Sequence, residues 1–348
     1  MKNYKSYFRP AIDAMSGYTP GEQPKVMDLL KLNTNENPYP PCPAVMDEFD
    51  AERLRLYPDP TADKLRDTIA EVYGYARQNI IVSNGSDDML TIAFRALSDA
   101  QRPVAFLDPT YSLYTVLADL QGCQCIKLPL NDDFSIKDDL LEKAAPANLL
   151  IIARPNAPTG NCINIDDMRK ICSEFDGVVL IDEAYADFSA DNCIDFVREF
   201  PNVIVSRTVS KSYSLAGLRL GFAIASPELI AGMMKVKDSY NVNMLTQYLA
   251  EAAIRDQEYL NKTVARIKDS REKLSSELKA LGFEVVDSQS NFLFASPPDG
   301  DGEKLFNALR EQNIIVRYFP GEKTGKYIRI TIGTEEQLQR LVKFLRVK

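Results

Sequence analysis

The sequence predicts an α/β protein in which a mostly parallel central sheet is covered by helices and a smaller α+β domain follows at the C-terminal end. Apolar runs such as 80–82 and 149–153 alternate with stretches of helical spacing, as expected for strands buried on both faces of a parallel sheet. After about residue 226 a long helical stretch replaces this alternation. The chain has 348 residues, a length that favours two domains.

The first part of the chain is punctuated by prolines, and we expect residues 1–43 to form an irregular N-terminal arm. Residues 44–235 are predicted to form a large domain. Its expected helices include 87–97 and 112–120, and its expected strands are 80–82, 104–107, 125–128, 149–153, 178–181, 203–205 and 220–225.

Residues 236–348 are predicted to form a small C-terminal domain that includes a long linking helix. The helical stretch covers 245–281 and leaves room for breaks. Short strands are expected at 283–286, 291–294, 314–317 and 327–332, with helices near 303–312 and from 335 onward. This mixture is typical of an α+β unit joined to a larger domain.

Composition and charge limit the classes of function. The net charge is −8 and the basic residues are scattered, whereas a nucleic-acid binder needs a basic face. No apolar run is long enough to cross a bilayer, and residues 1–5 are not followed by the apolar stretch of a signal peptide. We therefore expect a cytoplasmic protein whose partners are small molecules rather than nucleic acid or membrane.

The chain contains six cysteines without a Cys-x-x-Cys pair and no histidine at all, which argues against a metal site. We expect the thiols to be reduced and mostly structural. Since histidine is missing, any general acid or base must be Lys, Tyr, Asp, Glu or Cys.

Four polar clusters follow predicted strands. Because the carboxyl ends of parallel strands meet at one edge of a sheet, where ligands bind, these clusters are expected to converge. They are Asn-Gly-Ser-Asp-Asp at 84–88, Arg-Pro-Asn-Ala-Pro-Thr-Gly at 154–160, Asp-Glu-Ala-Tyr at 182–185 and Thr-Val-Ser-Lys at 208–211. Each one alone is compatible with an ordinary turn or helix cap. All four together predict a ligand site.

The chemistry of these clusters fits pyridoxal phosphate. Lys211 supplies an amine for a covalent link to the cofactor aldehyde, and Asp182 supplies a carboxylate that would keep a pyridinium nitrogen protonated. A phosphate would bind at the start of a helix, where backbone N–H groups are free. The side chains expected around that phosphate are Ser86, Asp87, Thr208, Ser210 and Arg219.

Other side chains are expected around the cofactor ring and the substrate. Tyr185 and Asn156 are predicted to hydrogen-bond the phenolic oxygen of the ring, and Tyr111 to stack on it, although core packing also explains Tyr111. Arg317 and Arg329 each lie in an apolar strand of the C-terminal domain. An edge position or a salt bridge is the alternative there; we favour recognition of the acid group of a substrate.

These segments, in this order, resemble the fold-type I, pyridoxal-phosphate-dependent aminotransferases of the class-II kind, and most closely the histidinol-phosphate aminotransferase family. The resemblance covers essentially the whole chain. It rests on Ser-Lys at 210–211 with Arg-Leu-Gly-Phe at 219–222, and on the clusters at 84–87, 155–160 and 182–185. Asn-Glu-Asn-Pro at 35–38, Tyr-Pro-Asp-Pro at 57–60 and Tyr-Ile-Arg at 327–329 add to it.

The resemblance implies a fold-type I transferase fold and assigns further roles. Lys211 would bind the cofactor and then shuttle the proton. Tyr57 would reach the cofactor phosphate of the neighbouring subunit, which implies a homodimer with shared active sites. Arg329 would face the substrate phosphate, assisted by Arg317, Tyr18 and Asn35.

The implied reaction is transamination between L-histidinol phosphate and 2-oxoglutarate in L-histidine biosynthesis, giving imidazole-acetol phosphate and L-glutamate. An aromatic-amino-acid aminotransferase and an O-phosphothreonine decarboxylase would use the same lysine, aspartate and phosphate site, so these motifs do not separate them. A regulatory protein that senses pyridoxal phosphate without turnover is the alternative outside enzymes.

Two segments depart from the family pattern, and one of them is the segment after Gly-Ser-Asp, which continues with Asp88 where glutamate is frequent. The turn that usually reads Asn-Pro-Asn-Asn-Pro-Thr-Gly has Arg154 and Ala157 in place of two of its asparagines. Asn156 remains, and we expect it to keep the contact with the cofactor.

Overall fold

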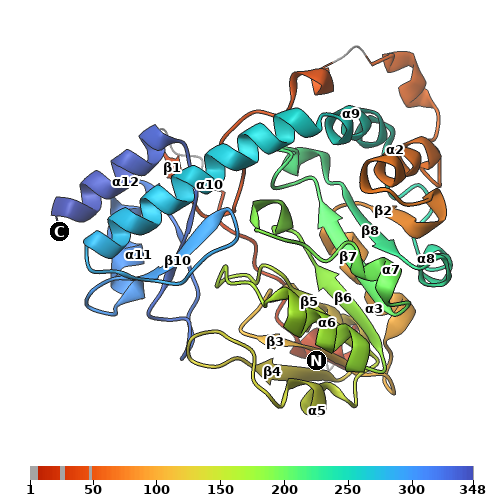
Figure 1. Ribbon diagram of the computed structural model, residues 1–348, viewed down its shortest axis with the longest axis horizontal. Helices are drawn as coiled ribbons and strands as arrows, with labels where there is room; N and C mark the ends of the chain where they lie inside the picture. Colours follow the sequence, from red (N-terminus) through yellow and green to blue (C-terminus); the bar gives the residue numbers. More distant parts are fainter. Residues whose placement is uncertain (1–6, 24–27, 47–48, 348) are drawn as a thin grey trace, which may run out of the picture.

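The structure, a computed structural model, describes residues 7–23, 28–46 and 49–347, so that the segment 1–5 considered above for a signal peptide lies outside it. Figure 1 shows a larger body around a central sheet and a smaller body at the C-terminal end, with helix α10 (Gln257–Ala280) running between them. Among the helices of the described residues, none is long and apolar enough to cross a membrane.

The larger body is built on a seven-stranded sheet with the order β2-β8-β7-β6-β5-β3-β4. Neighbouring strands pair in parallel except at β8, which runs antiparallel to both β2 and β7. The expected mostly parallel sheet is therefore confirmed. Its strands are β2 (Ile80–Ser83), β3 (Val104–Asp108), β4 (Cys125–Pro129), β5 (Leu149–Ala153), β6 (Val178–Asp182), β7 (Val203–Thr208) and β8 (Gly221–Ala225).

Apolar side chains cover both faces of this sheet. In β5, Leu150 and Ile152 belong to one core cluster, while Leu149 and Ile151 belong to a second cluster on the other face. This is the side-chain alternation of a strand with two buried faces, and each such side chain contributes about 2 kcal/mol on burial. The helices are α2 (Asp63–Tyr73), α3 (Ser86–Leu97), α4 (Leu113–Gln121), α5 (Leu140–Ala144), α6 (Ile165–Glu174), α7 (Phe196–Glu199) and α8 (Pro227–Met234).

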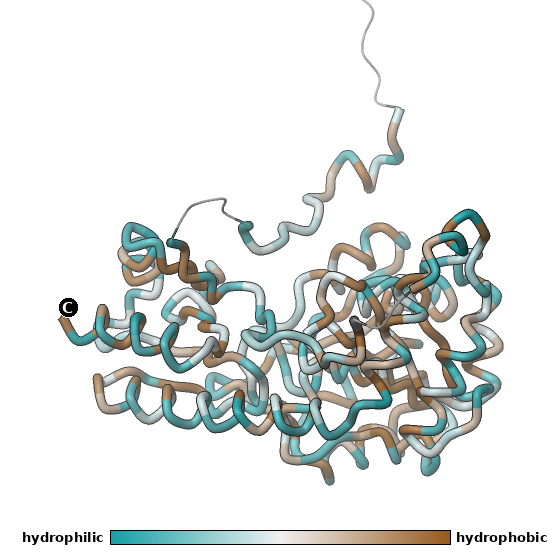
Figure 2. The backbone as a smooth tube through the Cα atoms, turned by 90° about the horizontal axis from the view of Figure 1, so that it is seen from above, coloured by the Kyte–Doolittle hydropathy of each residue, from teal (hydrophilic) through white to brown (hydrophobic). Residues whose placement is uncertain are grey.

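The smaller body contains a four-stranded antiparallel sheet with the order β12-β13-β10-β9. Its strands are β9 (Glu284–Val285), β10 (Phe292–Ser296), β12 (Arg317–Tyr318) and β13 (Ile328–Thr331), and its helices α11 (Gly302–Glu311) and α12 (Glu335–Val347). In Figure 2, α12 alternates between hydrophilic and hydrophobic colours towards the C-terminus, as a helix with one buried face does.

The predicted long helix is interrupted once. Helix α9 (Met244–Arg255) ends before Asp256, and α10 begins directly after it. The Asp256 carboxylate accepts a hydrogen bond from the backbone N–H of Tyr259 at 3.0 Å and so caps α10.

The N-terminal segment is more regular than predicted. It contains helix α1 (Pro10–Ala14), strand β1 (Leu30–Lys31) and two 3₁₀ turns, Pro43–Met46 and Ala51–Arg55. Strand β1 pairs in parallel with β11 (Ile314–Ile315) of the smaller body. Residues from the two ends of the sequence therefore meet in one small sheet. No local sequence pattern predicts this long-range pairing. The domain limits at 43 and 235 stay a prediction.

Candidate active site

A cavity of about 290 Å³ opens at the carboxyl edge of the central sheet. Strands β2, β3, β5, β6 and β7 all end at this edge, and antiparallel β8 begins there, because Gly221 pairs with both Ser83 and Thr208. The cavity brings together most of the predicted site residues: Tyr18, Asn35, Ser86, Asp87, Tyr111, Asp182, Tyr185, Thr208, Ser210, Lys211, Arg219, Arg317 and Arg329.

One end of the cavity is suited to a phosphate group. Helix α3 begins there at Ser86, directly after Gly85, whose φ of +85° is accessible mainly to glycine. A Cβ on Gly85 would lie 2.5 Å from Nη2 of Arg219, and a Cβ on Gly221 would lie 2.6 Å from the backbone nitrogen of Ser86. These two glycines let the arginine and strand β8 approach the free N–H groups at the helix start.

Hydroxyl groups complete this end of the cavity. Thr208 Oγ1 lies 3.0 Å from Ser210 Oγ, and Arg219 Nη1 lies 3.4 Å from the same Ser210 oxygen. Arg219 Nη2 is also 3.5 Å from a carboxylate oxygen of Asp87, a loose ion pair with about half of each side chain exposed. A bound phosphate would compete with that carboxylate for the guanidinium.

Tyr111 extends from the loop after β3 over the cavity. Its hydroxyl donates to Asp87 Oδ1 at 3.1 Å, and its ring makes an edge contact with Tyr18 at a centroid distance of 5.8 Å. Burial and the Asp87 carboxylate raise the pKa of Tyr111 above its ordinary value. The ring is thus fixed from two sides while it lines the cavity.

Asp182 ends strand β6 with a carboxylate that is 6% exposed. Tyr114 donates its hydroxyl to Oδ2 at 2.7 Å, and the backbone N–H of Ala184 donates to Oδ1 at 3.3 Å. Burial raises the pKa of Asp182 to about 6, although these two hydrogen bonds act in the opposite direction. The chain offers this carboxylate no cationic side chain within ion-pair distance in the part that the structure describes.

Lys211 points its amine into the cavity from the loop after β7. Nζ donates to the backbone oxygen of Thr34 at 3.1 Å and lies 5.8 Å from the ring centroid of Tyr185. The backbone of the lysine loop is held by Asn37, whose amide donates to the carbonyls of Lys211 and Ser212 at 3.1 and 3.0 Å.

A buried ion-pair network contacts the loop that carries Lys211. Arg207 Nε lies 2.8 Å from Glu183 Oε2, and Arg207 Nη1 lies 2.6 Å from Asp187 Oδ1. Asp187 accepts a short hydrogen bond from the hydroxyl of Ser212, the residue after Lys211. The arginine and Glu183 side chains are 4% and 0% exposed.

Tyr185 and Asn35 are hydrogen-bonded to each other in the wall of the cavity. The Asn35 amide donates to the Tyr185 hydroxyl at 2.9 Å, and its oxygen accepts from Thr331 Oγ1 at 3.0 Å. The Tyr185 ring also makes an edge contact with Phe292 at 5.2 Å. Segments from the N-terminal arm and the smaller body therefore hold a side chain of the larger one.

Two arginines of the smaller body face each other across neighbouring strands. Arg317 of β12 and Arg329 of β13 are directly paired in the antiparallel register, which places their side chains on one face of the sheet. Arg329 Nε is buried and has no hydrogen-bond partner among the described residues, and burial lowers its pKa. Two adjacent cations, one with an unused donor, indicate an anion site at this end of the cavity.

Two predicted site residues do not line the cavity. Asn156 is flanked by Pro155, Ala157 and Pro158, which line the cavity, and its contact with the ring oxygen of the cofactor stays a prediction. Its amide donates to Pro109 O at 3.0 Å and to Thr159 Oγ1 at 2.8 Å, and a contact with a cofactor oxygen would exchange one of these bonds.

Tyr57 lies on the surface, 80% exposed, and stacks on Tyr240 with a centroid distance of 4.7 Å. It is absent from the lining of its own chain's cavity. The predicted role in a neighbouring subunit stays a prediction.

Residues behind the cavity wall carry no signal of their role in the sequence. Tyr114 lies in the apolar stretch that forms α4, and only the fold brings it to Asp182. Arg207 and Glu183 each flank a residue that was singled out, yet nothing local shows that they pair.

Comparison with known proteins adds to this geometry. The family model "Aminotransferase class I and II" matches residues 27–345. A protein of Trichormus variabilis named histidinol-phosphate aminotransferase 1 is 45% identical over 345 residues, covering 98% of each chain. One of Clostridium acetobutylicum named histidinol-phosphate aminotransferase is 42% identical over 343 residues, covering 97% of each chain.

A solved structure has the same fold. The histidinol-phosphate aminotransferase of Sinorhizobium meliloti, crystallised in complex with pyridoxal 5′-phosphate, superposes with a TM-score of 0.89 at 23% identity and covers 99% of this chain and 97% of its own. This likeness confirms the expected fold class.

Proposed function

The chain belongs to the class I and II aminotransferases, and on that premise we propose that its cavity exchanges an amino group between L-histidinol phosphate and 2-oxoglutarate with pyridoxal phosphate as cofactor. The products are imidazole-acetol phosphate and L-glutamate, and the reaction is a step of L-histidine biosynthesis. The observation that carries the proposal is the convergence of an amine, a buried carboxylate and two separate anion sites in one cavity, in a chain with such relatives.

The donor set of the cavity fits pyridoxal phosphate. Asp182 is a buried carboxylate whose strongest contact is a hydroxyl, so that it suits a cationic ring nitrogen. The start of α3 with Thr208, Ser210 and Arg219 suits a dianionic phosphate. Lys211 and Tyr185 lie at the same wall, where an amine and a phenol would meet the aldehyde and the ring oxygen.

Pyridoxal phosphate supplies an aldehyde that takes up the substrate amine and a ring that withdraws electrons from the bonds at Cα. Lys211 would hold the cofactor and, once displaced by the substrate, move the proton at Cα, since the chain has no histidine for this task. Tyr111 would cover one face of the ring.

The paired Arg317 and Arg329 would hold the acidic end of each substrate. The phosphate of histidinol phosphate and a carboxylate of 2-oxoglutarate are both anions that a guanidinium binds through two hydrogen bonds. Tyr18 and Asn35 line the cavity beside them. Anions of different size at one site are compatible with a reaction that binds two substrates in turn.

Replacing Lys211 with alanine tests the assignment of the cavity. We expect Lys211→Ala to abolish glutamate formation while the protein remains folded by circular dichroism. Turnover within tenfold of the wild-type protein would refute the assignment, because general acid–base and covalent roles contribute factors of about 10² or more each. A protein that binds pyridoxal phosphate and turns over no amine would be a sensor instead.

We also propose that two copies form a dimer with shared active sites. Tyr57 and its surroundings expose apolar side chains to an unusual extent: Leu54, Leu56, Tyr57, Tyr240 and Leu245 are 38–80% exposed. Such a patch is suited to an isologous contact with a second copy of this chain.

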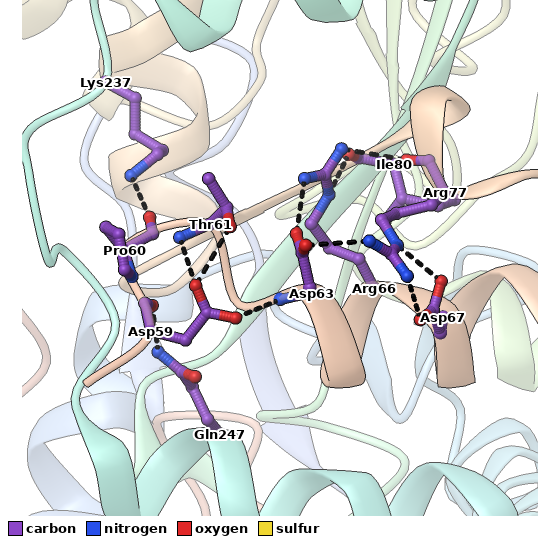
Figure 3. A network of polar contacts seen from close by, with 10 residues as sticks. All are labelled: Asp59, Pro60, Thr61, Asp63, Arg66, Asp67, Arg77, Ile80, Lys237 and Gln247. Carbon is purple, nitrogen blue, oxygen red and sulfur yellow. Dashed lines mark hydrogen bonds and ion pairs between the residues drawn. The ribbon is translucent and has the colours of Figure 1, made fainter.

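The turn after Tyr57 is held firmly, as Figure 3 shows. The Asp59 carboxylate accepts hydrogen bonds from the backbone N–H groups of Thr61 and Asp63 at 2.9 and 2.8 Å. The backbone carbonyl of Asp59 accepts a hydrogen bond from the side-chain amide of Gln247 at 2.9 Å. Lys237 donates to Pro60 O at 3.1 Å. A tyrosine that protrudes from so fixed a turn is suited to reach into a partner.

Mixing two inactive variants tests the sharing. If Tyr57 serves the partner's cavity, a hybrid of one Lys211→Ala chain and one Tyr57→Ala chain contains one intact cavity. Re-association of an equal mixture is expected to restore about a quarter of the wild-type sites. A monomer in ultracentrifugation, or no recovery in the mixture, would contradict the shared site.

A further inference from the structure

Tyr114 is a buried tyrosine that directs its hydroxyl at the carboxylate proposed to face the cofactor. It lies in α4, is 0% exposed and donates to Asp182 Oδ2 at 2.7 Å. It does not line the cavity, so neither substrate nor cofactor would touch it. Its ring packs against Phe106 and Tyr111 at centroid distances of 5.7 and 5.6 Å.

The surroundings of Asp182 otherwise disfavour its charge. Asp87 of α3 and the adjacent Glu183 both add negative charge, and Glu183 is already paired with Arg207. Tyr111 and Tyr185 face the same cavity but make no hydrogen bond to Asp182 among the described residues. Lys211 donates to Thr34 O instead.

The second carboxylate oxygen of Asp182 accepts only a long hydrogen bond among the described residues. Oδ1 accepts a hydrogen bond of 3.3 Å from Ala184 N, whereas the contact of Oδ2 with Tyr114 is short. A strong donor on one oxygen fixes the carboxylate plane and leaves lone pairs of the other available.

We propose that Tyr114 is a positioning residue that holds Asp182 ionised and oriented for the ring nitrogen of pyridoxal phosphate. The inference rests on the proposed function and adds to it the residue that prepares the carboxylate before the cofactor arrives. A hydroxyl donor favours the ionised over the neutral carboxyl, which offsets part of the effect of burial. Fixed orientation lowers the free energy that binding would spend on ordering the side chain.

Tyr114→Phe removes the hydroxyl and retains the ring contacts with Phe106 and Tyr111. The matched control is Tyr73→Phe, which removes a hydroxyl from a half-buried tyrosine, 3.4 Å from that of Tyr213, at a residue outside the cavity lining. Both variants and the wild-type protein would be freed of cofactor and titrated with pyridoxal phosphate from pH 5.5 to 8.5. A parallel titration would use the 1-deaza analogue, in which carbon replaces the ring nitrogen.

We expect Tyr114→Phe to weaken binding of pyridoxal phosphate about tenfold to a hundredfold, as for a lost hydrogen bond to a charged group. The loss should grow towards low pH, since Asp182 of the variant takes up its proton at higher pH. Binding of the 1-deaza analogue should change less than threefold, because that ring has no nitrogen to pair with Asp182. Tyr73→Phe should match the wild-type protein with both ligands.

Three results would overturn the proposal. They are unchanged binding of pyridoxal phosphate by Tyr114→Phe, an equal loss for both ligands, and a Tyr114→Phe protein that does not fold while Tyr73→Phe does. An equal loss for both ligands, or a Tyr114→Phe protein that does not fold, would show that the Tyr114 hydroxyl serves only the packing of the core. If the wild-type protein itself failed to bind pyridoxal phosphate, the proposed function would fall, which is a distinguishable outcome.

Discussion

Replacing Arg207 with methionine should destabilise the protein strongly, because the arginine is the buried cation of the network beneath the lysine loop. Its Nη2 and Nε lie 2.7 and 2.8 Å from one oxygen of Glu183, and Nη1 lies 2.6 Å from Asp187. Glu183 is 0% exposed, so that no water can replace the lost partner. Breaking a buried pair from one side costs about 3–5 kcal/mol.

The free energy of unfolding would be measured by denaturant titration of the cofactor-free protein. Arg95→Met is the control, since the Arg95 pair with Asp238 at 3.2 Å has side chains 45% and 71% exposed. Such a surface pair contributes about 1 kcal/mol at most. A loss below about 1 kcal/mol for Arg207→Met would refute the reasoning that an unpaired Glu183 is left in a dry interior.

A second substitution separates lost packing from lost charge. Arg207→Met combined with Glu183→Gln removes the uncompensated carboxylate, and we expect the double variant to be more stable than Arg207→Met alone. If the double variant were less stable, the arginine would act mainly by filling space. Asp187 of this network accepts a hydrogen bond from Ser212, the residue after Lys211. Catalytic turnover should therefore fall in parallel with stability.

Two further predictions concern the cavity itself. In the cofactor-free protein the pKa of Asp182 is raised from 3.8 to about 6, so the folded state binds that proton more tightly than the unfolded state. The contribution to stability is then largest below pH 4 and falls by roughly 3 kcal/mol as the pH rises towards 6. The Asp182→Asn variant should lack this fall in stability between pH 4 and 6. If the unfolding free energies of the variant and the wild-type protein changed with pH in parallel, the raised pKa of Asp182 would be contradicted. Gly221→Ala would place a Cβ 2.6 Å from backbone atoms of Gly85 and Ser86, and should destabilise by about 1–3 kcal/mol and weaken phosphate binding. An unchanged dissociation constant for pyridoxal phosphate would show that the close approach of β8 does not shape the phosphate site.

The sequence predicts the central sheet well because its signals are local. Apolar runs bounded by polar residues mark β5 and β6, and the residues that follow each strand reach the cavity by the geometry of parallel sheets alone. The sequence therefore predicts Asp182, Lys211 and Ser86 at one edge of the sheet, and the structure brings them together.

The parts of the fold and of the site that the sequence does not predict depend on contacts between distant segments. Strand β1 forms only because Leu30 meets Ile314, and the Arg317–Arg329 pair depends on the register of β12 and β13. The turn motif identifies Asn156, but its hydrogen bond with Pro109 of a distant loop follows only from the fold, and its contact with the cofactor stays a prediction.

Substrate discrimination tests the central claim most directly. Amino-group transfer to 2-oxoglutarate would be followed as glutamate formation with L-histidinol phosphate and L-phenylalanine, and carbon dioxide release would be followed with O-phospho-L-threonine. We predict that kcat/KM is highest for histidinol phosphate by at least about tenfold, since the proposed anion site at Arg317 and Arg329 would hold its phosphate. A higher kcat/KM for phenylalanine, or carbon dioxide released from phosphothreonine, would contradict the proposed reaction.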